Sequence, residues 1–442
     1  MSKVPSVVQI LDRVRSSLWF LPGLMALGAL ILGVLAPAAD RRIPSDWLLD
    51  APRVFSGNPA GARAILATIA TSMITIAGIV FSMTIVSLQL AASQFGPRLL
   101  RTFLRDRGNQ VVFGTFLATF LYCVLILPTI DGGEDELFVP RIGVTIAVVL
   151  AVVGLAMLVY FLNHVAQSIH ADAVIAAVGC ELDTVIDELF PDSLGEDGHD
   201  EDDGTTLAGA PMEIEARASG YVRFIDGDAL LDVATRHDLT IKVVATVGSF
   251  VIEGDDVAHV WPASRQDTDV IASEICAAVA LGTHRTALQD TLFVFEQLVE
   301  MAVRALSPGI NDPTTAKHCI DRIGTGLCRL VTRRMPSPLR RDENQTVRVI
   351  AVPVTVDDIL AEAIEPLARH AGVHLTVWLG LLRILDASAR RARRPGDRAA
   401  CLSYARRIAA TAHAALENEH DRDRLAEATA FLPRPAHDPS GG

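Results

Sequence analysis

The longest uncharged stretch of this chain runs from Ile65 to Ser93, and it constrains the fold more than any other feature. Its 29 residues exceed the roughly 20 apolar residues that a helix needs to cross a bilayer. The 442-residue chain is 50% hydrophobic with a mean hydropathy of +0.35, too apolar for an ordinary soluble protein. We therefore predict four spans in contact with a lipid bilayer, at about 18–39, 64–93, 111–130 and 142–163.

Polar side chains of the second predicted span gather on one side of the helix. At about 100° per residue, most of them fall within an arc of roughly 100°, and two apolar residues interrupt the row. This polar stripe consists of Thr68, Thr71, Ser72, Thr75, Ile79, Ser82, Val86, Gln89 and Ser93. Lipid offers no hydrogen-bond partner, so the stripe should face other helices or water.

Two interpretations of the polar stripe remain open. Serine, threonine and glycine let helix backbones approach closely, which favours a packing face. Alternatively, the stripe lines a pore or cavity, with Ile79 and Val86 as a hydrophobic constriction. No ionisable residue lies between Ile65 and Ser93, so the usual marker of an ion or proton relay is missing.

Charge bias between the loops predicts the orientation. The N-terminus is basic, the second loop carries Arg98, Arg101, Arg105 and Arg107, and the loop 131–136 is acidic. The excess of arginine and lysine places the N-terminus, the second loop and the C-terminal part in the cytoplasm. Arginines in the first loop argue weakly the other way. We expect a multi-pass protein of the bacterial inner (plasma) membrane with both termini cytoplasmic.

Shifts in composition and periodicity predict the domain boundaries. A cytoplasmic N-terminus precedes a four-helix transmembrane domain, a helical extension and an acidic linker. A β-rich module, a mostly helical domain with a strand near 345–355, and a disordered tail follow. In this order the segments are 1–17, 18–165, 166–189, 190–211, 212–262, 267–431 and 432–442. Pro353 favours an edge position for the strand, because proline has no amide hydrogen to donate.

Charge and cysteine usage exclude several classes of function. The formal net charge is −13, and Glu181 to Asp203 contains eleven acidic residues and no lysine or arginine. The rest of the chain is close to neutral, so a general nucleic-acid binder is not indicated. The six cysteines are dispersed without a C-x-x-C pair, which indicates reduced thiols that bind no metal. No cofactor is expected.

Two short motifs suggest the fold of the β-rich module. They are Ser219-Gly220-Tyr221-Val222 and Gly248-x-Phe250-Val251-x-x-Gly254-Asp255-x-Val257. This stretch resembles the barrel-sandwich hybrid modules of lipoyl and biotin carriers and of membrane-fusion adaptors. Carriers place an acceptor lysine in the following hairpin, where this chain has residues 260–265 with no lysine. The resemblance implies the β-module without carrier activity.

The segment between residues 282 and 318 contains the cluster of polar residues that most suggests a binding site. Its candidate ligand-binding members are His284, Arg285, Asp290, Asn311, Asp312 and Thr314. Asn-Asp-Pro is what a helix start requires, so a structural role is one interpretation. An anion-binding or ligand-binding helix N-terminus is a second, and a metal or general-base site that includes His318 is a third. The spacing matches no metal signature and the chain lacks common catalytic motifs, so we do not expect an enzyme.

Five segments carry a resemblance to a known family. They are Phe81–Ala91, Ser93–Arg98, Gly282–Thr286, Gln289–Asp290 and Arg304–Pro313. Together they resemble a family of bacterial membrane proteins catalogued as domain of unknown function 2254. The resemblance implies an N-terminal membrane bundle and a cytoplasmic C-terminal domain, and it carries no established activity.

The whole sequence predicts a multi-domain membrane protein. A bundle of four transmembrane helices is joined to an α+β cytoplasmic domain that contains the barrel-sandwich-like β-module. Our leading hypothesis is an oligomeric, channel-like or transport-related protein that self-associates through its second helix and passes an ion or small molecule. The alternative is a membrane-anchored ligand sensor or scaffold without transport activity.

Overall fold

The computed structural model divides the chain into two compact units, Met1–Ala173 and Val174–Gly442. It describes residues 19–42, 55–95, 107–132, 137–168, 170–190, 207, 209–263, 268–351 and 353–432. The expected N-terminus 1–17, most of the acidic linker and most of the tail lie outside these residues.

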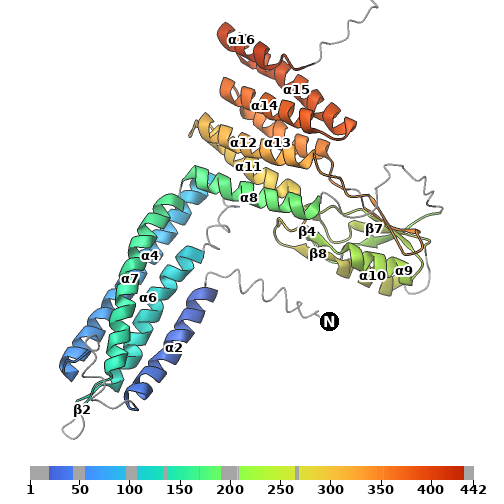
Figure 1. Cartoon of the computed structure of the whole chain (residues 1–442). Helices are drawn as coiled ribbons and strands as arrows, with labels where there is room; N and C mark the ends of the chain where they lie inside the picture. The colour runs from blue at the N-terminus through green and yellow to red at the C-terminus, as the bar shows by residue number, and fades with distance from the viewer. Residues whose placement is uncertain are drawn as a thin grey trace, which may run out of the picture. The chain divides into compact units, whose positions relative to one another are not determined.

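The first unit contains four helices that are long and apolar enough to cross a membrane, which confirms the predicted four spans (Figure 1). They are α2 (Phe20–Asp40), α4 (Pro59–Phe95), α6 (Arg107–Ile126) and α7 (Arg141–Ser168). Helix α6 packs against each of the other three. The connection from α6 to α7 contains the short 3-10 helix η2 (Leu127–Thr129) and the hairpin β1 (Asp131–Gly132) and β2 (Leu137–Phe138).

Helix α4 begins earlier than the sequence pattern indicated. The Asn58 side chain accepts a hydrogen bond from Gly61 N at 2.8 Å, and Pro59 occupies the first helical position. These start signals add a turn that we had assigned to the loop. The 37 residues of α4 give a length of about 55 Å, well beyond the roughly 30 Å hydrocarbon core of a bilayer.

Two buried polar side chains of the first unit form hydrogen bonds at the start of α7. The Asp40 carboxylate accepts from Ile142 N and Gly143 N at 3.0 and 3.1 Å, so it caps α7. The buried Tyr122 hydroxyl donates to the Gly143 carbonyl at 2.9 Å, which joins α6 to α7. Large apolar side chains cover the exposed faces, as a lipid-facing surface requires; they include Leu24, Val34, Leu35, Val152, Leu155 and Val159.

The second unit contains a two-sheet β-region and a stack of helices, and α8 (Ala171–Leu189) packs on the stack through the ion pairs of Asp187 with Arg329 and Arg333. The strands are β3 (Met212–Glu215), β4 (Gly220–Ile225), β5 (Thr240–Val243), β6 (Phe250–Val251), β7 (Asp256–Trp261), β8 (Val279–Gly282), β9 (Leu339–Arg341) and β10 (Val347–Ala351). They form two sheets, with the orders β3-β7-β5-β10-β9 and β6-β4-β8. Helices α9 (Gly227–Arg236) and α10 (Thr268–Ala278) contribute to the shared apolar core.

The two sheets correct parts of the sequence analysis. Both are open, and no closed barrel forms among the described strands, so the barrel-sandwich arrangement is not found. Strand β10 lies between β5 and β9, so its predicted edge position is wrong. It ends at Ala351, before Pro353, and the missing amide hydrogen of the proline therefore costs no ladder hydrogen bond. Strand β8 lies within the segment 267–431, for which the sequence analysis predicted a strand only near 345–355.

The remaining helices pack on one another in a stack (Figure 1). They are α11 (Thr291–Ala305), α12 (Pro313–Leu330), α13 (Val356–His370), α14 (Leu375–Arg391), α15 (Pro395–Ala415) and α16 (Glu419–Ala428). Helices α12 and α14 run in the same direction, because Asp321 pairs with Arg383 and Cys328 with Ser388. Helices α12 and α14 approach closely at Gly324, where an added Cβ would lie 2.3 Å from Ile384 Cγ2. On the same helix pair, a Cβ at Gly380 would meet Ile320 at an ordinary 3.4 Å.

This asymmetry generates a stability prediction. We expect Gly324→Ala to lower the stability of the protein by ~1–3 kcal/mol, because the added methyl group overpacks the contact with Ile384. The matched variant Gly380→Ala should be neutral or stabilising by ~0.5–1 kcal/mol, since alanine favours the helix. Thermal unfolding of the detergent-solubilised full chain, followed by circular dichroism, measures both. A Gly324→Ala protein as stable as Gly380→Ala would contradict the packing argument.

Candidate functional site

The polar stripe lies on the face of α4 that points away from the other helices. The packing face of α4 is apolar and buried, and consists of Ala62, Leu66, Ala70, Met73, Ala77 and Val80. At about 100° per residue the stripe falls on the opposite side of the helix. Its exposed members are Thr68, Thr71, Ser72, Thr75, Ile79, Ser82, Val86 and Gln89, whereas the side chain of Ser93 lies outside the described residues.

Only part of the stripe is satisfied within its own helix. The hydroxyls of Thr68 and Thr75 donate to the carbonyls of Ala64 and Thr71, both at 2.7 Å. The carboxamide of Gln89 is exposed, and it has more donors and acceptors than a helix backbone can satisfy. The stripe is exposed and lies opposite the packing face, so among the residues that the structure describes it does not serve packing within a single copy.

The predicted ligand residues near 285 form a partly buried ion-pair joint, in which Asp290 is the most buried member. Arg285 donates from Nε and Nη2 to Asp290 at 2.8 and 3.0 Å, and from Nη1 to Glu296 at 2.6 Å. Burial would lower the pKa of Arg285, but these hydrogen bonds to two carboxylates hold it above its ordinary value. Asp290 also accepts from Phe293 N at 3.0 Å and therefore caps α11.

The same joint fastens the β-region to α11. Gly248 has φ of +89°, and a Cβ there would lie 2.3 Å from Asp290 Oδ2, so only glycine fits this turn beside the ion pair. The side-chain amide of Gln289 accepts from Ile225 N at 2.9 Å and donates to Ile225 O at 3.3 Å. Arg285 and Asp290 are thus occupied by structural contacts, while His284 is exposed.

The second predicted ligand group caps α12. Asp312 accepts from Thr315 Oγ1 at 2.6 Å, from Thr315 N at 3.1 Å and from Thr314 N at 3.0 Å. The Thr315 hydroxyl, followed by the Thr315 amide, holds the pKa of Asp312 below its ordinary value. Asn311 takes a left-handed φ of +51°, and the side chains of Asn311 and Thr314 are exposed.

The two predicted ligand groups do not form one site. Asp290 precedes α11, and Asn311 and Asp312 follow its end. The 15 residues of α11 separate the groups by about 22 Å along the helix axis. Asp290 caps the start of α11, and Asp312 caps the start of α12. These roles agree with the structural interpretation of the Asn-Asp-Pro pattern.

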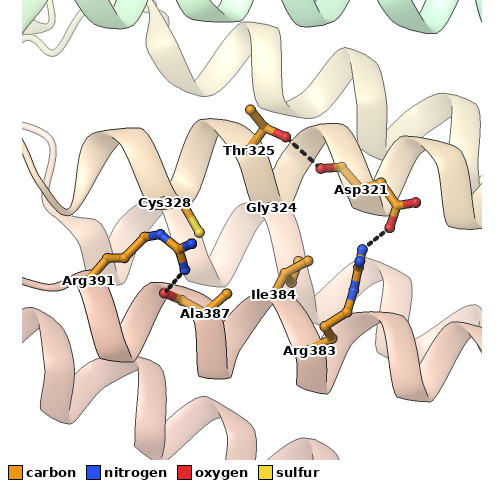
Figure 2. Close-up of a pocket in the computed structure, with 8 residues that line it drawn as sticks. All are labelled: Asp321, Gly324, Thr325, Cys328, Arg383, Ile384, Ala387 and Arg391. Atoms are coloured by element: carbon orange, nitrogen blue, oxygen red, sulfur yellow. Dashed lines mark hydrogen bonds and ion pairs between the residues drawn. The ribbon is translucent and has the colours of Figure 1, made fainter.

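A pocket that the sequence analysis missed lies between α12 and α14 (Figure 2). Its volume is about 310 Å³, and its lining consists of Asp321, Gly324, Thr325, Cys328, Arg383, Ile384, Ala387 and Arg391. Figure 2 shows Arg383 directed to Asp321, and Arg391 reaching back to the carbonyl of Ala387, which accepts from Nη1 at 3.0 Å. Arg383 is already paired with the Asp321 carboxylate, so two guanidinium groups and one carboxylate leave a net positive charge at the opening, which suits a small anion. The arginine run at 390–394 was the only sequence signal near it.

Comparisons with known proteins identify the chain's relatives. Uncharacterized proteins of Mycobacterium tuberculosis (strain H37Rv) and of Mycobacterium bovis are each 33% identical over 438 residues, which cover 96% of this chain and 82% of each relative. No solved structure matches the chain. The sequence model of a family described as predicted membrane protein (DUF2254) matches residues 15–387. The chain therefore belongs to the DUF2254 family of predicted membrane proteins, as the resemblance had indicated.

Proposed function

We propose that the protein is a channel-like homo-oligomer in which the polar stripe of α4 from several copies borders one shared pathway. The observation that carries this proposal is the exposure of every described stripe residue, on the side of α4 opposite its packing face. Thr68 and Gln89 are 21 residues apart, so the stripe extends about 32 Å, close to the roughly 30 Å thickness of the hydrocarbon core.

The physical argument for self-association is the cost of polar groups in lipid. In a lone copy, the side chains of Ser72, Ser82 and Gln89 would meet hydrocarbon without hydrogen-bond partners. A second copy offers the same polar face, and closed symmetry is the usual arrangement of homo-oligomers. Gly78, beside the stripe, leaves open space that lets a neighbouring helix approach.

The two apolar members of the stripe suit a constriction. Ile79 and Val86 are 54% and 61% exposed within an otherwise polar row. Apolar rings in a polar pathway restrict passage by excluding water. No charged side chain lies on the stripe, so the lining itself does not select the sign of an ion. The proposal includes no enzymatic step.

The proposed orientation places both termini on the cytoplasmic side of the bacterial inner membrane. It is supported by the basic residues before α2 and between α4 and α6, and by the acidic residues between α6 and α7. The second unit would then be a cytoplasmic regulatory domain.

A flux assay tests the pathway. We expect the full chain in lipid vesicles to conduct small ions, and Ser82→Leu and Gln89→Leu each to reduce this flux severalfold, because both place bulk and apolar surface in the pathway. The control Val152→Leu changes an exposed position on α7, with 64% exposure, and should leave the flux unchanged. An intact oligomer that passes no ion, or that conducts equally in all variants, would contradict the proposal.

Cross-linking tests the oligomer interface independently of flux. The background carries serine at Cys180, Cys276 and Cys328, the cysteines that are not buried. In membranes treated with a mild oxidant, Thr75→Cys and Ser82→Cys should form disulfide-linked dimers, because symmetry brings the stripe of two copies together. Val152→Cys should not. If only the Val152→Cys variant formed disulfide-linked dimers, the interface would lie on α7 and the proposed interface on α4 would be wrong.

The pocket between α12 and α14 favours a second candidate function, a membrane-anchored ligand sensor or scaffold without transport activity. The pocket is large enough for a small molecule, and Arg383 and Arg391 would select an anion. Its wall also includes Cys328, whose Sγ lies 3.6 Å from the buried Ser388 hydroxyl.

Native mass spectrometry of the purified full chain tests the second candidate. A sensor should carry a small anionic molecule in the wild type and lose it in Ala387→Trp, because the indole would fill the pocket. The exposed substitution Val373→Ala, outside the pocket lining, serves as the control and should keep the molecule. The same anion bound equally by all three proteins would exclude this pocket as the ligand site.

A further inference from the structure

Three metal-ligating side chains converge on the five-stranded sheet, on the neighbouring strands β3 and β7. Glu213 of β3 pairs directly with His259 of β7, so the two side chains share one face of the sheet. His259 Nε2 lies 3.2 Å from Asp256 Oδ2 at the start of β7. One ligand atom from each residue lies within 4.8 Å of those of the other two.

A register irregularity creates this cluster. Residues three apart on a regular strand point to opposite faces, which would separate Asp256 from His259. The pairing of β3 with β7 shifts register between Ile214 and Glu215. Val257 and Ala258 are consecutive and both buried, so the strand does not alternate there. The bulge therefore turns Asp256 onto the solvent-facing side that carries His259.

We propose that Glu213, Asp256 and His259 bind one divalent transition-metal ion, for which Zn²⁺ is the test cation. An imidazole nitrogen and carboxylate oxygens bind zinc at about 2.0–2.2 Å, so neighbouring ligand atoms in a tetrahedral shell lie about 3.4 Å apart. Glu213 is exposed and free to rotate the small remaining distance. Three protein ligands leave the fourth position for a solvent molecule.

The surroundings hold the imidazole and keep the face anionic. The ring of Trp261 meets His259 edge-on, with centroids 6.1 Å apart and an interplanar angle of 75°. Trp261 is itself anchored, since Nε1 donates to Gly209 O at 3.0 Å. Lys242 of β5 pairs opposite His259 on the other side. The carboxylates of Glu213 and Asp256 outnumber the single ammonium group of Lys242, so the face has a net negative charge when His259 is neutral. A neutral imidazole is the form that binds a metal ion.

The site differs from an ordinary surface ion pair by its third ligand. His237 and Glu274 form a comparable pair, with Nε2 and Oε2 3.4 Å apart, and no third ligand joins them among the residues that the structure describes. His237 therefore provides a matched control within the same chain. A bound metal ion would also tie β3, the edge strand of its sheet, to β7, so metal binding should stabilise the second unit.

Isothermal titration of the EDTA-treated, detergent-solubilised full chain with zinc chloride tests the proposal. The wild type should bind one zinc ion and gain thermal stability, and His237→Ala should behave in the same way. His259→Ala should lose this binding, and Glu213→Gln should weaken it by at least about tenfold, because each removes one of three ligands.

Three outcomes would overturn the proposal. They are a wild type without stoichiometric zinc binding, unchanged affinity in both His259→Ala and Glu213→Gln, and a loss in His237→Ala as large as that in His259→Ala. Circular dichroism verifies that each variant is folded. Glu213→Gln keeps the size and exposure of the side chain, so it decides the matter if His259→Ala does not fold.

Discussion

The absence of hydrogen-bond partners in lipid is the constraint on which the first unit depends. Asp40 satisfies the first amides of α7, and the Tyr122 hydroxyl reaches the Gly143 carbonyl. Threonines within the helices donate to the carbonyl one turn earlier, as Thr68 and Thr119 do at 2.7 Å. The serines and the glutamine on the outer side of α4 are exceptions to this pattern. Polar side chains without hydrogen-bond partners are unfavourable in lipid, so their presence there requires another explanation.

In the second unit, a group of charged residues joins the β-region to α11. Arg285 engages both Asp290 and Glu296, and Asp290 also caps α11. Replacing one member of a buried ion pair leaves an uncompensated charge, so such a joint tolerates little change. Gly248, on the β-region side, also cannot be replaced without a clash, because any side chain there would overlap Asp290. The motif that looked most like a ligand site therefore has a sufficient structural explanation.

Features that depend on a few neighbouring residues were predicted correctly from the sequence. Hydropathy identified the four spans, and Asn-Asp-Pro identified the start of α12, because length, apolarity and capping act within a few residues. The position of β10 depends on β5, which lies more than a hundred residues earlier, and no sequence window contains that pairing. The start of α11 at Thr291 also depends on the fold, because Gln289 just before it is held by a hydrogen bond from Ile225 in the β-region.

The candidate sites follow the same division. Helical periodicity predicts that the stripe lies on one side of α4, but only the packing of α6 and α7 decides that this side faces outward. Glu213 and His259 are adjacent through strand register, and Asp256 joins them through a bulge that the sequence pattern does not reveal. The proposed pathway requires the stripes of several copies, whereas the three residues of the proposed metal site all lie in one copy. Loss of the oligomer would therefore abolish the proposed pathway and leave zinc binding intact.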